Sequence, residues 1–186
     1  MQAILEATVQ VLLKLGKERL TTTRVALRAG VSVGTVYQYF PNKKSLLQAA
    51  LKRHLEEVTR AVESVCEEQK GRTVKEMATG LISAFLAAKM RDAKTSVAMY
   101  SVSADVDGAK IVEQMRVRSN KAIAGMLATA SQRLTKDGQL VASMLQATMA
   151  GVSRRLLESG TSEKEFGGYR EELILICGAY LEASSN

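Results

Sequence analysis

The chain has 186 residues, of which 46% are hydrophobic and 24% charged, with 13 Gly, one Pro, two Cys and a formal net charge of +7. This composition excludes an intrinsically disordered chain, a collagen-like or Pro-rich protein and a small domain built on a disulfide framework. The apolar runs are far shorter than the ~18 residues of a membrane span, and no signal-peptide pattern opens the chain. We therefore expect a globular protein with a cytoplasmic location and no membrane partner.

Helix-forming residues recur along the whole chain, and no alternating strand pattern is present, so the sequence predicts an all-α fold. Apolar residues at helical spacing, ended by Gly or Pro, predict about nine helices. The fourth is long and runs from an Asn42 cap up to Gly71. The others are predicted at Gln2–Leu15, Thr21–Ala29, Val33–Phe40, Thr73–Met90, Ala93–Val102, Ala109–Leu134, Gln139–Glu158 and Tyr169–Ala183.

Positive charge is concentrated in the first third of the chain. Residues 1–60 contain ten Lys or Arg against four acidic residues, whereas the other 126 residues contain 16 against 15. This asymmetry predicts a small polyanion-binding head joined to a nearly neutral body. A merely solubilising surface charge is the alternative at this point.

Residues 21–44, TTTRVALRAGVSVGTVYQYFPNKK, carry the most informative pattern. Two short predicted helices flank Ala29-Gly30-Val31-Ser32, where Gly30 permits a left-handed turn and Val31 fills the angle, as a helix-turn-helix requires. With Val36 facing inward, helical geometry directs Gly34 and Gln38 outward and places Thr35 and Tyr37 on the flanks. Such side chains allow close approach to a duplex, donation to phosphates and recognition of a base edge.

Residues 21–47 resemble the DNA-binding signature of the tetracycline-repressor (TetR) family of transcriptional regulators. The resemblance rests on the Thr-Thr cap, Val25-Ala26, the segment 29–32, Gly34-Thr35-Val36-Tyr37, Tyr39-Phe40 and Asn42-Lys43 before Leu46. It implies a three-helix helix-turn-helix DNA-binding domain over residues 1–47, followed by a helical ligand-binding and dimerisation domain over residues 48–186. It also implies that Lys43 binds a phosphate and that DNA is contacted by Thr22, Thr23, Arg24, Ser32, Val33, Gly34, Thr35, Tyr37, Gln38, Tyr39 and Lys43.

Two features depart from the family pattern. Leu27 stands on the outward face of the second helix, where the family usually has a polar residue. The basic arm that often precedes the first helix is missing, so we expect a chain shortened at its N-terminus.

Several residues have plain structural interpretations. Tyr39 lies near the inward side of its helix, which leaves core packing and phosphate contact as equal alternatives. Lys44, Lys52 and Arg53 are interpreted as a solvated face. The single histidine, His54, offers no catalytic pair or metal site, and the two cysteines are interpreted as small buried hydrophobic residues, so we expect no enzyme, no metal and no cofactor.

The predicted eighth and ninth helices suggest a homodimer. Apolar residues surround nearly the whole circumference of the helix at residues 173–181, which therefore needs more than one partner. Two such helices from each subunit would form a four-helix interface about a two-fold axis, and central packing within one subunit is the alternative. The interface is predicted at Met144, Leu145, Thr148, Val152, Leu173, Ile176, Cys177 and Tyr180.

The Met-rich body predicts an adaptable apolar ligand pocket, although ordinary core filling explains the methionines equally well. The predicted lining residues are Phe85, Met99, Tyr100, Met115, Met126 and Gln146. Together these features predict a dimeric repressor that binds a palindromic operator in double-stranded DNA and is released by a small-molecule inducer. A helical ligand-binding or scaffold protein without DNA function is the alternative.

Overall fold

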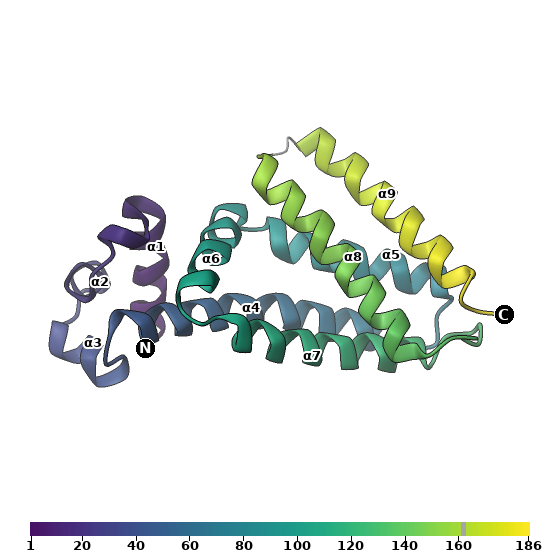
Figure 1. The fold of residues 1–186 in the computed structure, drawn as a ribbon, viewed down its shortest axis with the longest axis horizontal. Helices are drawn as coiled ribbons and strands as arrows, with labels where there is room; N and C mark the ends of the chain where they lie inside the picture. Colours follow the sequence, from purple (N-terminus) through teal and green to yellow (C-terminus); the bar gives the residue numbers. More distant parts are fainter. Residues whose placement is uncertain (161–162) are drawn as a thin grey trace. The chain divides into compact units, whose positions relative to one another are not determined.

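The structure, a computed structural model, describes residues 1–160 and 163–186 (Figure 1). The described residues form nine helices and no strand, which confirms the predicted all-α fold. The helices are α1 (Gln2–Arg19), α2 (Thr22–Ala29), α3 (Val33–Tyr39), α4 (Lys43–Glu68), α5 (Val74–Met90), α6 (Ala93–Asp105), α7 (Ala109–Leu127), α8 (Gly138–Ser159) and α9 (Glu163–Glu182).

Several helix boundaries differ from the predicted ones. Gly16 interrupts α1 as predicted, because its backbone (φ 76°, ψ 167°) is non-helical, and after this kink residues 17–19 form a short continuation of α1. Helix α9 begins before the Gly167-Gly168 pair, so these glycines lie inside the helix. Gly167 and Gly168 therefore do not delay the start of α9, although glycine is unfavourable inside a helix.

The predicted helix ending at Leu134 stops at Leu127 in the structure. The segment after it, residues 128–137, is irregular because its polar groups bond outside any helix. The Ser131 amide donates to the carbonyl of Arg72 at 3.0 Å, and the Thr135 amide donates to the carbonyl of Ser184 at 2.8 Å. These long-range partners satisfy the backbone as well as a helix would, and no local sequence pattern reveals them.

The chain divides into two compact units. The first contains residues 1–56 and 94–113, and the second contains residues 57–93 and 114–186. Helix α4 is continuous through this division, and the predicted functional boundary after residue 47 also lies within it.

The first unit is built on contacts of α1 with α2 and of α2 with α3. Val25, Val36 and Leu46 are fully buried at its centre. Helix α6 adds Met99 and Val102 to the same core, and Val106 from the following turn joins them. This packed core gives α3 a rigid base.

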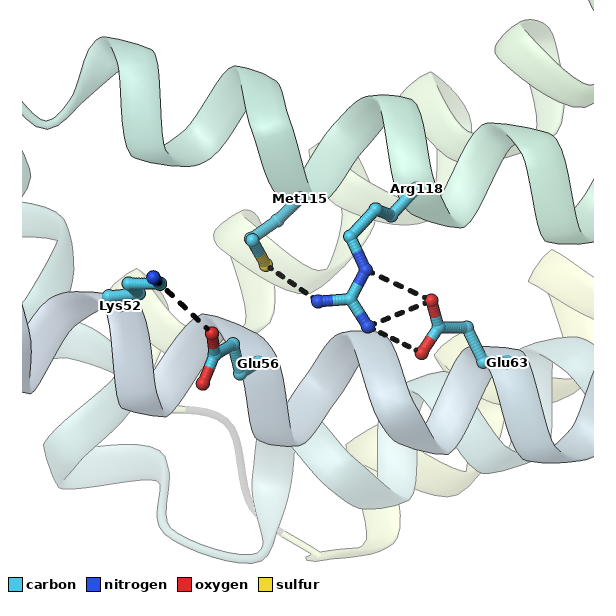
Figure 2. Close-up of polar contacts among 5 residues, drawn as sticks. All are labelled: Lys52, Glu56, Glu63, Met115 and Arg118. Atoms are coloured by element: carbon cyan, nitrogen blue, oxygen red, sulfur yellow. Dashed lines mark hydrogen bonds and ion pairs between the residues drawn. The ribbon is translucent and has the colours of Figure 1, made fainter.

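The second unit has α5 at its centre, packed against both α8 and α9, and α8 also packs against α9. A capping box starts α5: Thr73 Oγ1 accepts from the Glu76 amide at 3.2 Å, and the Glu76 carboxylate accepts from the Thr73 amide at 2.9 Å. Arg118 of α7 binds Glu63 of α4 through both carboxylate oxygens, at 2.7 and 2.9 Å from Nη2 (Figure 2). Within residues 1–160 and 163–186, every helix falls short of the length and hydropathy needed to cross a bilayer.

Candidate nucleic-acid interface

Helices α2 and α3 form the predicted helix-turn-helix. Thr21 begins α2 by accepting a hydrogen bond from the Arg24 amide. Gly30 ends α2 in the left-handed region (φ 68°, ψ 31°), and the Val31 amide donates back to the Ala26 carbonyl at 3.0 Å. The left-handed turn costs glycine least, so Gly30 fixes the angle at which α3 leaves α2.

Helix α3 separates a buried face from an exposed one. Val36 and Phe40 face the core, with 0% and 7% of their surfaces exposed. Gly34, Tyr37 and Gln38 are exposed, as the helical geometry predicts. Tyr39 is exposed as well, at 52%, which favours the interface alternative over core packing. The outward surface of α3 is therefore polar apart from the tyrosine rings.

Ser32 and Thr35 fix the start of α3. Ser32 Oγ accepts from the Thr35 amide at 3.0 Å, and the two hydroxyl oxygens lie 2.9 Å apart. A Cβ atom added at Gly34 would lie 3.6 Å from Ser32 Oγ, which is ordinary van der Waals contact. The fold itself therefore leaves room for a side chain at position 34. With glycine there, no side chain protrudes from this part of the outer surface of α3.

Thr22 supports Tyr37 from below. Thr22 is buried, and its hydroxyl donates to the Tyr37 hydroxyl oxygen at 3.2 Å. The Tyr37 O–H hydrogen is then left to donate to an external acceptor. The buried Thr22 side chain thus positions Tyr37, and a DNA contact by Thr22 stays a prediction.

Arg24 and Lys43 both bind the end of α1. The Arg24 guanidinium donates to the carbonyl of Arg19, and Lys43 Nζ donates to the carbonyl of Lys17 at 2.5 Å. Carbonyls in the last turn of a helix lack helical partners and attract cations. Both predicted DNA contacts therefore also have a structural role, which the sequence pattern did not reveal.

The remaining predicted contacts differ in exposure. Thr23 is exposed and Val33 is partly buried against the core of the first unit. Leu27, the departure from the family pattern, is 84% exposed. An apolar side chain this exposed is not needed by the core.

The six predicted pocket residues belong to two different units. Met99 is buried in the core of the first unit, and Tyr100 follows it on α6. Phe85 and Met126 are buried in the core of the second unit. Met115 and Gln146 are held by Arg118 and by the Arg116 carbonyl. Core filling, the alternative interpretation of these methionines, describes Met99 and Met126.

The predicted dimer residues divide into buried and exposed groups. Leu145, Leu173 and Cys177 are buried in the core of their own chain, so the prediction for these three is corrected. Met144 and Ile176 are 48% and 55% exposed. Thr148, Val152 and Tyr180 are partly buried. Helix α9 does contact two helices, α5 and α8, and still leaves an apolar side exposed.

The two cysteines are buried, as predicted. Burial raises the pKa of the Cys66 thiol to about 12 and that of the Cys177 thiol to about 11. Because the reactive form is the thiolate, both thiols are poor nucleophiles at neutral pH.

Comparison with protein families matches both parts of the chain. Residues 4–50 match the family described as bacterial regulatory proteins, tetR family. Residues 73–181 match the tetracyclin repressor-like C-terminal domain. The chain belongs to the TetR family.

Two curated relatives are HTH-type transcriptional repressors. The HTH-type transcriptional repressor KstR of Rhodococcus jostii is 36% identical over 114 residues, which are 60% of this chain and 52% of KstR. KstR of Mycolicibacterium smegmatis is 47% identical over 55 residues, 30% of this chain and 27% of that repressor. The chain thus matches about half or less of the length of these relatives. Together with the family match, they support a DNA-binding transcriptional regulator.

Solved structures share the fold along nearly the whole chain. A putative TetR-family regulator from Rhodococcus sp. has a TM-score of 0.71 and 24% identity, with 96% of each chain covered. FadR from Bacillus subtilis, solved in complex with stearoyl-CoA, has a TM-score of 0.68 and 18% identity, with 97% of this chain and 95% of FadR covered. A putative regulator from Pseudomonas aeruginosa PAO1 has a TM-score of 0.75 and 16% identity, with 98% and 88% covered.

Proposed function

We propose that this TetR-family member is a repressor that binds a palindromic operator as a homodimer and is released by a small-molecule inducer. The observation that carries the proposal is the capped helix α3, which stands on a rigid core and exposes Gly34, Tyr37 and Gln38. Short polar side chains on an exposed recognition helix suit the major groove. The proposed contact set is completed by Thr22, Thr23, Arg24, Ser32, Val33, Thr35, Tyr39 and Lys43, and Thr22 also supports Tyr37.

Homodimer formation is supported by the exposed apolar side chains of α8 and α9. Leu140 and Met144 are 56% and 48% exposed on α8, at i, i+4 spacing on one side of the helix. On α9, Leu175 and Ile176 are 63% and 55% exposed. Large apolar side chains this exposed on two helices that pack against each other favour association with a partner. A second copy would bury them and supply the second recognition helix that a palindrome requires.

The inducer is proposed to be a neutral or lipophilic small molecule that binds in the second unit. The support is the match of residues 73–181 to the tetracyclin repressor-like C-terminal domain and the fold shared with FadR, which was solved in complex with stearoyl-CoA. Release requires that the inducer bind more tightly to the state that does not fit the operator. Helix α4, which runs from the recognition region into the second unit, is one of the covalent connections between the two units.

Selection from a random duplex pool tests DNA binding directly. We expect an enriched palindrome whose affinity falls steeply as salt is raised. On that duplex, Tyr37→Phe removes one hydroxyl donor and Lys43→Gln keeps a donor for the Lys17 carbonyl while removing the charge. The double variant should bind more weakly, with a salt slope smaller by about one.

Lys121→Gln is the matched control, because Lys121 is exposed on α7 in the second unit. Its affinity and salt slope should equal those of the wild type. If no duplex is enriched, the DNA-binding proposal is wrong and the helical ligand-binding or scaffold alternative takes its place.

A further inference from the structure

The end of α6 and the turn before α7, residues 105–108, belong to the basic first unit and contact its lysines. Asp105 forms an ion pair with Lys17, and Asp107 forms one with Lys44. Between the two acids, Val106 is buried in the core and its carbonyl accepts from Gln48 Nε2 at 2.7 Å. These contacts fix both carboxylates beside lysines that lie far away in the sequence.

The turn is closely packed at Gly108. A Cβ atom at Gly108 would lie 2.8 Å from the Leu51 side chain and 2.7 Å from the Ser103 carbonyl oxygen, so only glycine fits. Asp107 is the one non-glycine residue with positive φ, 53°, in the described chain. The backbone therefore presents the two acids in a defined geometry.

The paired lysines adjoin the proposed phosphate contact. Lys43 and Lys44 begin α4 directly after the recognition region, and Lys43 Nζ bonds the carbonyl of Lys17. Lys17, Lys43, Lys44 and Asp105 together line one cavity of about 380 Å³. One basic cluster is therefore partly neutralised by the chain itself.

The ion pairs are too exposed to be explained as stabilising contacts. Side-chain exposure is 36% for Lys17 and 46% for Asp105, and 53% for Lys44 and 79% for Asp107. Pairs this open to water contribute little to folding stability. A carboxylate within a Debye length, about 10 Å at 0.1 M salt, nevertheless opposes the approach of a phosphate.

The protonation of the pairs agrees with this geometry. The Asp105 carboxylate raises the pKa of Lys17, and Lys44 lowers the pKa of Asp107. Each ion pair therefore favours the charged form of Lys17 or of Asp107.

We propose that Asp105 and Asp107 set the DNA affinity of the repressor by competing with DNA phosphates for Lys17 and Lys44. The inference rests on the proposed function. It assigns a role to Lys44, which the sequence alone places on a solvated face, and to two acids outside the helix-turn-helix.

The test is the salt dependence of affinity for the selected duplex, measured for the full chain with Asp105→Asn, Asp107→Asn and both. For every lysine that gains a phosphate, the slope of log affinity against log salt should steepen by about 0.9. If variant and wild type bind equally at 1 M salt, this change in slope makes the variant bind roughly eightfold more tightly than the wild type at 0.1 M salt. Asn accepts the left-handed conformation of Asp107, and Asp107→Gly is the second variant should Asn disturb the turn.

Two controls separate competition from a general charge effect. Glu6→Gln removes the same charge from the first unit, where Glu6 pairs with Arg53 at 3.3 Å, and should change the slope less than Asp107→Asn. In a Lys44→Gln background, Asp107→Asn should no longer tighten binding, because the competing partner is gone.

Each outcome decides between the proposals. Tight wild-type binding with equal slopes for all variants would overturn the competition alone. Weaker binding by the Asn variants would also overturn it and would show that the turn positions the recognition region. If neither wild type nor variants bind any duplex, the proposed function and this inference both fail.

Discussion

At the residue scale, the proposed DNA interface depends on residues that are small or that are positioned by hydrogen bonds to neighbouring residues. Gly34 is exposed, and the fold leaves space for a side chain at this position. The fold therefore does not require glycine here, and the missing side chain lets a partner approach α3 closely. Thr22 holds the Tyr37 hydroxyl, and Ser32 holds the amide of Thr35. Local geometry thus prepares the surface of α3 before any DNA arrives.

Gly34→Ala should separate stability from DNA binding. Replacing a helical glycine stabilises the fold by about 0.5–1 kcal/mol, because the unfolded chain loses freedom. The added methyl group should weaken DNA binding roughly tenfold, in the range of one lost base contact of ~1–3 kcal/mol. Thermal unfolding and duplex affinity measure the two effects.

Gly125→Ala provides the matched control, because Gly125 is an exposed glycine of α7 with no atom near its added Cβ. It should raise stability and leave affinity unchanged. Equal affinity of Gly34→Ala and wild type would remove Gly34 from the interface.

The cysteines give a second prediction at this scale. With the pKa of Cys66 at about 12 and that of Cys177 at about 11, the thiolate fraction at pH 8 is very small. Alkylation by iodoacetamide should therefore be slow in the folded protein and fast in urea. Rapid modification of the folded protein, followed by mass spectrometry, would contradict the burial of these thiols.

At the scale of elements, the ends of the helices depend on specific partners. The capping box of Thr73 and Glu76 starts α5, the central helix of the second unit. The Thr73 hydroxyl and amide lower the pKa of the Glu76 carboxyl, because both donate to its charged form. The charged Glu76 carboxylate therefore adds to the free energy of unfolding at pH values above its pKa in the unfolded chain. This addition is lost as the pH falls through the lower pKa of Glu76 in the folded protein.

Thr73→Ala should destabilise the fold by about 1 kcal/mol near pH 7, the usual cost of losing an N-cap. The difference from wild type should shrink below pH 4.5, where Glu76 becomes protonated and its half of the box weakens. Denaturant unfolding at several pH values measures this. Thr79→Ala on the same helix is the control, because the Thr79 hydroxyl only bonds back to the Lys75 carbonyl. A pH-independent difference would show that the Glu76 half contributes nothing.

At the scale of the whole molecule, the proposed binding to a palindrome requires association of two chains. Met144→Glu with Ile176→Glu places charges on the exposed apolar sides of α8 and α9. We expect a monomer in sedimentation equilibrium, native-like circular dichroism and much weaker binding to the full palindrome, because the second recognition helix is lost. Val117→Glu, at a 54% exposed valine of α7, should remain dimeric. A dimeric double variant would place the interface elsewhere.

The sequence by itself determined the all-α class, the helix-turn-helix and the faces of α3 except at Tyr39, because these depend on local signals. Helical geometry placed Tyr39 near the inward side, and the structure leaves it 52% exposed. Helical periodicity, the Ser32 cap and the left-handed Gly30 act within a few residues of one another. The resemblance of residues 21–47 to the TetR family is local in the same way, and the family match bears it out.

Only the tertiary structure decided what distant residues do. Thr22 is buried under Tyr37, Lys43 bonds the end of α1, and the helix predicted up to Leu134 ends at Leu127. The partners of Asp105 and Asp107 are 88 and 63 residues away in the sequence. Which apolar residues of α8 and α9 are core and which are exposed depends on what packs against them. Contacts across such separations arise from packing of whole helices, and no local pattern encodes them.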